Sequence, residues 1–464
     1  MPNLTPTGAN PRAVDSIPRL IARFAIPAII SGLVNALYNI VDQIFIGQGV
    51  GMLGNAATNV AFPLNTISTA MALLLGVGSA SNFNLAMGAG DKERARRIAG
   101  NGFSLLAIGG VSLAVFVFLF LDQLLLLFGA TPEVFDYART YTGITTLGLP
   151  FIIFAVGGSS LVRADGSPAY SMLCVLSGAL LNTILDPIFL FVFGWGIAGA
   201  AWATITGQIV AASLVAVYIT RFKAVRITWA DLRPRLKLLG AIAALGAAAC
   251  FNQLAMMLVQ VTLNNTLTHY GALSDYGSNI PLACVGVISK VNIVFMAFVL
   301  GISQGCQPIF GFNYGAGRYS RVRSTYKTAA FIVTGLSTVA FVLFQCFPRQ
   351  IVSIFGQGSP LYFQFAQRYM RIYMMVIFAN GIQPITSNFF TSIGRAKMGI
   401  LISLTRQILF LLPLIVLFPI FFGIDGVMYA GPIADTAALT LAGVLMVREF
   451  RRMPAQDKPI TAQE

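Results

Sequence analysis

Charged side chains are scarce in this sequence of 464 residues: 10% are Asp, Glu, Lys or Arg, whereas 56% are hydrophobic. The few charges are gathered between long apolar runs and are rare within them. A soluble domain of this size would spread charges along the solvated faces of its helices. The composition therefore excludes a soluble globular protein and indicates an integral membrane protein whose main partner is the lipid bilayer.

Histidine and cysteine are scarce as well. The single histidine, His269, lies outside the apolar runs, and the five cysteines lie within them without the spacing of a metal site or a disulfide framework. A membrane-embedded enzyme would need a metal cluster or a nucleophile with its base. We therefore expect no enzyme, no cofactor and no metal other than a transported Na⁺ ion.

Apolar runs of about 20 residues, the length that crosses a bilayer, occur twelve times. Backbone groups in lipid must bond within their own segment, so runs this long predict helices and not the shorter, alternating strands of a barrel. The predicted fold class is all-α with twelve transmembrane helices. Their approximate bounds are 20–46, 57–84, 98–121, 137–160, 170–193, 197–219, 238–264, 281–306, 328–347, 366–391, 399–420 and 425–447.

Lysine and arginine obey the positive-inside rule if both termini are cytoplasmic. On that assignment the basic residues gather in the inside segments, above all in 221–237, whereas the outside loops hold only Arg349, with Arg139 close to one of them. The net charge of +14 then needs no nucleic-acid partner, because anionic headgroups lie beside the basic loops. We expect a monomeric, multi-pass protein of a bacterial inner (cytoplasmic) membrane.

A motif of Gly-Ala-Gly followed by two arginines occurs twice, beginning at Gly88 and again at Gly315. The separation of these two glycines, which we call the repeat spacing, recurs along the chain, and a constant spacing of this kind indicates duplication. We predict two pseudo-symmetric six-helix lobes, 1–220 and 238–464, joined by a basic cytoplasmic linker, 221–237. Lobes related in this way are typical of transporters that rock about a central site. The repeat spacing also separates Gly78 from Gly305, Phe128 from Phe355, Gly196 from Gly423 and Gly199 from Gly426.

Three carboxylates, Asp42, Asp186 and Asp435, lie well within predicted spans. An aspartate at the centre of a membrane helix costs about 2.5–3.5 kcal/mol, so each needs a partner or a function. Asp435 has candidate partners in Lys290 and Arg406, which lie at similar depth in the second lobe. A structural ion pair and a role in a cavity both remain open for this C-lobe charge cluster.

Asp42 and Asp186 have no Lys or Arg at their depth, and both fall in the outer half of the bilayer, where they can meet. Buried carboxyls beside amide and hydroxyl oxygens suit a proton carrier or a Na⁺ site. The alternative is that Asp186 stays neutral and bonds only within its own helix. The polar residues that share a helix face with one of the two, or with each other, are Asn35, Tyr38, Asn39, Asn182, Thr204 and Gln208.

The stretches "NALYNIVDQIFIG", "GAGDKERARR", "RADGSPAYSM", "NTILDPIFLFVFGWGIAGAAWAT" and "QGCQPIFGFNYGAG" together resemble the multidrug and toxic compound extrusion (MATE) family, in its MepA-like and DinF-like branch. The resemblance implies two lobes around a V-shaped cleft and export of organic cations and other amphipathic compounds in exchange for H⁺ or Na⁺. By motif it implies a cation-coupling site of Asp42, Asn182, Asp186 and Thr204, with Tyr141 lining the same pocket.

Another branch of that family has a second cation site on its seventh and tenth helices, but those spans contain no acid here. The charges of Lys290 and Arg406 argue against a purely cationic substrate range. A lipid-linked saccharide flippase of the same wider superfamily is the alternative, although it would need several basic residues around a pyrophosphate. A channel is disfavoured, because duplicated halves suit alternating access.

Overall fold

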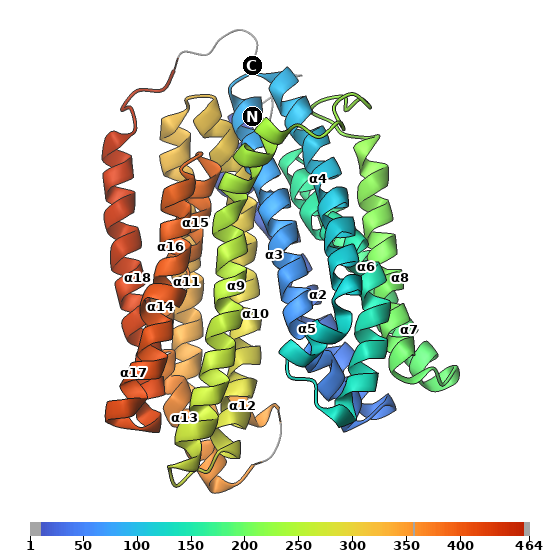
Figure 1. Ribbon diagram of the computed structural model, residues 1–464. Helices are drawn as coiled ribbons and strands as arrows, with labels where there is room; N and C mark the ends of the chain where they lie inside the picture. Colours follow the sequence, from blue (N-terminus) through green and yellow to red (C-terminus); the bar gives the residue numbers. More distant parts are fainter. Residues whose placement is uncertain (1–10, 356–357, 459–464) are drawn as a thin grey trace.

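The computed structural model describes residues 11–355 and 358–458 of the chain. Within these ranges the regular structure is helical, without any strand, and eleven helices are long and apolar enough to cross a membrane. The helices form two bundles that lie side by side (Figure 1). The prediction of an all-α membrane protein is thereby confirmed.

The first bundle, the N-lobe, is built from the helices that precede the linker. They are α1 (Pro11–Val14), α2 (Ile17–Gly49), α3 (Met52–Gly88), α4 (Lys92–Leu119), α5 (Leu121–Leu127), α6 (Pro132–Ala164), α7 (Pro168–Pro187), its π-helical extension η1 (Ile188–Val192), and α8 (Gly196–Ile219).

The second bundle, the C-lobe, follows the linker. Its helices are α9 (Leu236–Ala272), α10 (Asn279–Gly315), α11 (Tyr319–Cys346), α12 (Pro348–Ser353), α13 (Pro360–Tyr373), α14 (Ile377–Asn380), α15 (Ile382–Ser392), α16 (Ala396–Leu404), the π-helix η2 (Thr405–Leu411), α17 (Leu412–Phe422) and α18 (Ile424–Arg452).

The tenth predicted span, 366–391, is not one continuous helix; it is divided among α13, α14 and α15. Gln345 of α11 donates its Nε2 to the backbone oxygen of Arg371 at 2.9 Å, and Arg371 donates its Nε to the backbone oxygen of Gln345 at 3.3 Å. The Arg371 carbonyl is thus taken by a side chain, and the Met375 N–H bonds to Ile372 at 3.2 Å instead. A hydropathy average cannot register this competition from another helix.

Each lobe packs around the first turns of the other lobe's first long helix. The hydrophobic core of the C-lobe includes Leu20 and Phe24 of α2, whereas that of the N-lobe includes Ile242 of α9, with Leu238 packed against it. These helices correspond to each other in the repeat, so the exchange is itself pseudo-symmetric. The lobes are therefore interlocked at their cores and do not merely touch along a surface.

Glycines allow the crossing helices to approach closely. A Cβ at Gly305 of α10 would meet the backbone of Ala25 in α2, and a Cβ at Gly246 of α9 would meet the carbonyl of Leu74 in α3. Such contacts between the lobes run from the level of Gly32 to the end of the molecule that carries the described chain ends and the basic loops, which we call the basic end. The ribbons of the lobes diverge toward the opposite, far end (Figure 1).

Arg12 bridges the two lobes at the basic end. Its Nη1 donates to Asn84 Oδ1 at 2.9 Å and to the Ala164 carbonyl at 2.7 Å, both in the N-lobe. Its own carbonyl accepts from Asn313 Nδ2 and from Arg321 Nη2, each at 3.2 Å, in the C-lobe. Burial lowers the pKa of Arg12 to about 10, so the guanidinium is charged at neutral pH.

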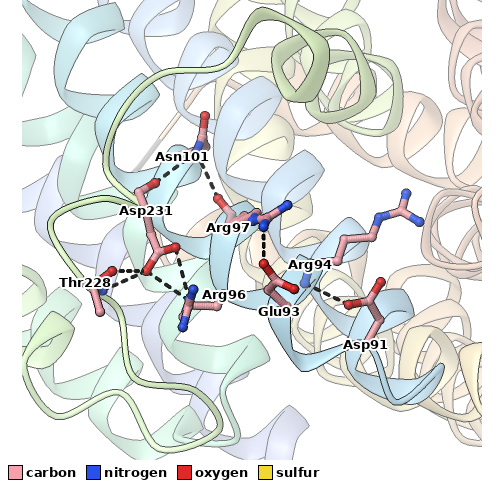
Figure 2. A network of polar contacts seen from close by, with 8 residues as sticks. All are labelled: Asp91, Glu93, Arg94, Arg96, Arg97, Asn101, Thr228 and Asp231. Carbon is pink, nitrogen blue, oxygen red and sulfur yellow. Dashed lines mark hydrogen bonds and ion pairs between the residues drawn. The ribbon is translucent and has the colours of Figure 1, made fainter.

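The linker between the lobes is fastened to the N-lobe, as Figure 2 shows. Buried Asp231 accepts from Arg96 Nε at 3.1 Å and from the Thr228 hydroxyl and N–H at 2.6 and 2.9 Å. Asn101 donates to the Asp231 carbonyl at 2.9 Å and accepts from the Arg235 N–H at 2.7 Å. The linker is therefore a bound strap that leads directly into α9.

We expect Asp231→Asn to loosen this strap at neutral pH. The change removes the carboxylate that pairs with Arg96 and costs about 1.5–3 kcal/mol of local stability, the usual value for a hydrogen bond to a charged group. The basic residues of 221–237 make the strap a substrate for trypsin, so the cleavage rate there should rise. Glu93→Gln removes an exposed carboxylate from the first turn of α4, near Arg96, and should leave the cleavage rate unchanged. Equal cleavage rates in the two variants would contradict the role of Asp231 in fastening the linker.

The pH dependence of the strap follows from the same contacts. Burial alone would raise the pKa of Asp231, but the bonds from Thr228 and the pairing with Arg96 outweigh it and lower the pKa. The stabilisation is therefore complete above the unfolded value of about 3.9 and is lost as the pH falls through the lower folded value. The protection factors of the linker amides, which are the exchange rates of an unstructured peptide at the same pH divided by their own, should remain high until the pH falls to that range.

Candidate functional site

Two carboxyl groups meet in the N-lobe, where α2, α7 and α8 come together. Asp42 comes from the second half of α2, and Asp186, which is 0% exposed, comes from the last turn of α7. Their side chains lie close enough to interact directly. Two ionised carboxylates at such a separation repel each other, so the arrangement favours a proton or another cation between them. No Lys or Arg in the described part of the chain forms an ion pair with either group.

The local fold around Asp186 departs from a regular α-helix. Pro187 has no N–H to continue the hydrogen-bond ladder, and the chain widens into η1, where the Phe193 N–H bonds to the Ile188 carbonyl at 2.9 Å. Wide π turns are frequent at functional sites in helices. The sequence pattern of an aspartate followed by proline thus sets the end of α7 at the carboxylate.

Asn182, one turn before Asp186, joins α7 to α8. In one amide orientation its Nδ2 donates to Asp186 Oδ1 at 3.4 Å and to Thr204 Oγ1 at 3.3 Å. With the amide turned over, Nδ2 donates to Asp186 Oδ2 at 3.2 Å, and the amide oxygen accepts from the Thr204 N–H at 3.2 Å and hydroxyl at 3.3 Å. The second arrangement satisfies both ends of the amide.

Two tyrosines complete this group. Tyr141, on α6, lies beside Thr204, and Tyr38, one turn before Asp42, lies near both carboxyls. The structure therefore brings together, from four helices, the predicted Asp42, Asn182, Asp186, Thr204, Tyr38 and Tyr141.

The group lies against two adjoining hollows of about 90 and 100 Å³, which share Tyr38, Thr204 and Gln208 in their walls. Asn35 lines the first hollow, and Asn39 lines the second together with Asp42. Within the described chain, Asp42 Oδ1 and Gln208 Oε1 are buried acceptors without a hydrogen-bond donor. Hollows of this size suit water or a small cation, because a pocket for a drug-sized ligand encloses roughly 300 Å³ or more.

Threonines of α6 also line the second hollow, and sequence reasoning missed them. Thr142, Thr145 and Thr146 follow each other at helical spacing on the same face as Tyr141. Their hydroxyls mostly bond to their own helix, as in the 2.6 Å bond from Thr146 to the Thr142 carbonyl. The helical spacing of these threonines could have indicated a polar helix face. Threonines that bond to a carbonyl of their own helix are common in membrane helices, however, so the pattern is not specific to a site.

In the C-lobe, Arg406 of η2 forms an ion pair with Asp435 of α18, and Asn380 Nδ2 lies 3.4 Å from Asp435 Oδ2. Both charged side chains are largely buried. Lys290 is exposed on α10, and no ion pair joins it to either partner in the ranges that the structure describes. Two members of the predicted charge cluster are thus together, and the third is not, because equal depth does not fix which way a helix face turns.

Comparison with known proteins places this geometry in context. A family model described as MatE matches residues 27–188 and 244–417. Multidrug export protein MepA of Staphylococcus aureus is 25% identical over 438 residues, which cover 93% of this chain and 94% of the relative.

Solved structures are similar over nearly the whole chain. One described as the outward-facing conformation of a multidrug resistance MATE family transporter of the MOP superfamily has a TM-score of 0.89, 24% identity, and coverage of 97% of this chain and 99% of its own. A MOP superfamily transporter from Pyrococcus furiosus gives a TM-score of 0.88 with the same identity and coverage. These likenesses show the fold, and with it the two-lobed architecture.

The buried pair in the C-lobe can be tested by its energetics. Asp435→Asn leaves the Arg406 guanidinium without a counter-charge, and breaking a buried pair in this way costs about 3–5 kcal/mol. Replacing both partners, by Arg406→Met with Asp435→Leu, should restore most of that stability. Thermal unfolding in detergent measures both, with Arg139→Gln, which breaks the exposed pair with Asp122, as a control that shifts little. A double variant as unstable as Asp435→Asn would contradict a purely structural pair.

Proposed function

The chain belongs to the MatE family, and on that premise we propose that it is a secondary active multidrug efflux antiporter. In this proposal it exports amphipathic compounds, organic cations among them, in exchange for H⁺ or Na⁺ by alternating access. The observation that carries the proposal is the contact of Asp42 with Asp186 beside a small hollow, without a Lys or Arg paired to either in the described chain. Such a pair must exchange a cation with water in order to change its charge.

Either coupling cation suits the site chemistry. A proton can be held between the two carboxyls, because desolvation and mutual repulsion disfavour two negative charges at contact distance. A dehydrated Na⁺ can instead take oxygen ligands from Asp42, Asp186, Asn182 and Thr204, all hard donors of the kind that such an ion prefers. In both cases the bound cation neutralises the pair.

The position of Asp42 suggests how its charge state acts on the lobes. The second half of α2 carries Asp42, whereas the first half packs against α10 near Gly301 and Gly305, and Pro27 lies inside that first half. A cation that binds at Asp42 therefore acts on a helix that also forms the contact between the lobes. In alternating access the lobes adopt two arrangements, and α2 moves with them. Coupling requires that the cation bind to α2 with a different affinity in each arrangement.

The charge balance of the C-lobe bears on the substrate. Asp435 neutralises Arg406, so the buried charge there is paired, and only exposed Lys290 remains of the predicted positive group. Organic cations are therefore not repelled by a net charge at that place. A paired arginine also offers little to a pyrophosphate, which disfavours the flippase alternative.

The multi-pass membrane location follows from the eleven spanning helices in the described ranges and the family. We further propose that the basic end faces the cytoplasm, as the positive-inside rule predicts, and that the far end faces outward.

We expect Asp186→Asn to abolish gradient-driven export while the protein still folds. The amide keeps the volume and the hydrogen bonds to Asn182 but cannot gain or lose a proton or supply a charge to Na⁺. Efflux of a fluorescent organic cation from proteoliposomes should be measured under a pH gradient alone and under a Na⁺ gradient alone. The gradient that drives the parent protein identifies the coupling ion.

Asp122→Asn serves as the matched control, since it also removes an N-lobe carboxylate, but one that is exposed and paired with Arg139. It should transport at the parental rate. Parental efflux by correctly inserted Asp186→Asn under either gradient would mean that the carboxylate is structural.

A further inference from the structure

The far end of the C-lobe carries arginines that the positive-inside rule does not explain. Arg349 lies at the start of α12, and Arg368 and Arg371 lie on α13. Together with Phe363, Gln364 and Gln367 they line an open hollow of about 490 Å³. We call this group of six residues the outer arginine pocket. Because the far end is predicted to face outward, its cations need another reason.

The pocket lies at the level where α11 ends. Arg371 donates its Nε to the backbone oxygen of Gln345 at 3.3 Å, and Gln345 is the last residue but one of α11, which ends at Cys346. Arg349 follows shortly after that end, in the first turn of α12. A spanning helix ends where the hydrocarbon gives way to headgroups, so the pocket lies at headgroup depth.

The charge in the pocket is only partly balanced. Arg368 is paired with Asp425 at 2.7 Å, whereas the Arg349 guanidinium lies over the ring of Phe363, 5.4 Å from its centre, and Arg371 bonds to a carbonyl. In the described ranges neither Arg349 nor Arg371 has a carboxylate partner. Two arginines and two glutamines therefore line the hollow with side chains that carry N–H donors.

An apolar surface leads up to the pocket from within the membrane. Val342 lies one turn deeper than Gln345 on nearly the same side of α11, and it is 48% exposed. Val339 and, further in, Phe331 extend this exposed side of the helix. A donor-rich pocket at headgroup depth above an exposed apolar helix side has the two halves of a phospholipid site.

We propose that the outer arginine pocket binds the headgroup of an anionic phospholipid of the outer leaflet. The phosphodiester oxygens accept from Arg349 and Arg371, whose planar forks match phosphate geometry, and from the amides of Gln364 and Gln367. The acyl chains lie along the exposed side of α11. A free soluble anion is less suited, because it would leave that apolar surface uncovered.

The site belongs to one lobe only. By the repeat spacing that relates Gly88 to Gly315, Arg349 corresponds to Asp122 in the N-lobe, where the carboxylate pairs with Arg139. The equivalent place in the N-lobe therefore has no surplus positive charge. The lipid would bind the two pseudo-symmetric lobes unequally.

The test uses the purified full chain in detergent, titrated with phosphatidylglycerol, with phosphatidylcholine as the uncharged-headgroup arm. Native mass spectrometry counts the bound lipids, and thermal unfolding gives the titration midpoint. We expect Arg349→Gln and Arg371→Gln each to weaken phosphatidylglycerol binding about fivefold, the effect of one arginine at an anionic surface, and the double variant to lose one bound lipid. Phosphatidylcholine binding should not change.

Arg139→Gln is the matched control, since it removes an exposed arginine of the far end from the other lobe. It should bind phosphatidylglycerol as the parent does. If the double variant fails to fold, Arg349→Gln alone decides, because its side chain forms no ion pair in the described chain. Unchanged phosphatidylglycerol binding in that variant would overturn the proposal, as would equal stabilisation of the parent by inorganic phosphate, which would indicate a free-anion site.

Discussion

An ionised carboxylate in a membrane interior must find a partner, and the two lobes meet this constraint differently. In the C-lobe, Arg406 neutralises Asp435 permanently. In the N-lobe, Asp186 interacts with the Asp42 carboxyl and the Asn182 amide, and it forms no ion pair within the described residues. One lobe therefore has a fixed internal charge pair, whereas the other has a pair whose charge depends on a cation from water.

The repeat makes this difference sharper. By the repeat spacing, Asp435 corresponds to Gln208 and Arg406 to Ala179, and both N-lobe residues line the first hollow. The place that is hollow in one lobe is occupied by a salt bridge in the other. In the described residues, the two halves thus share their helices but differ at this place, where one has a hollow and the other has an ion pair.

Hydropathy and helical periodicity predicted the spans and the faces that carry Asn182 and Thr204, because both depend on local repeats in the sequence. The position of Lys290 was not predictable in this way, since depth does not reveal which neighbour a helix turns toward. The first break in the tenth span coincides with a bond from Gln345 of another helix to the carbonyl of Arg371, a contact between helices that the local sequence does not reveal. The bridge formed by Arg12 lies outside every span, where neither signal applies. The role of the carboxyl pair remains a prediction that the sequence and the geometry support jointly.

The exchange of first turns between the lobes affects what each half of the chain can do alone. A polypeptide that ended before α9 would leave the N-lobe core without Ile242, and one that began there would leave the C-lobe core without Leu20 and Phe24. Each half therefore completes the hydrophobic core of the other. The arrangement is that of a domain-swapped dimer within one chain, in which two six-helix halves exchange their leading segments and neither half is a self-sufficient bundle.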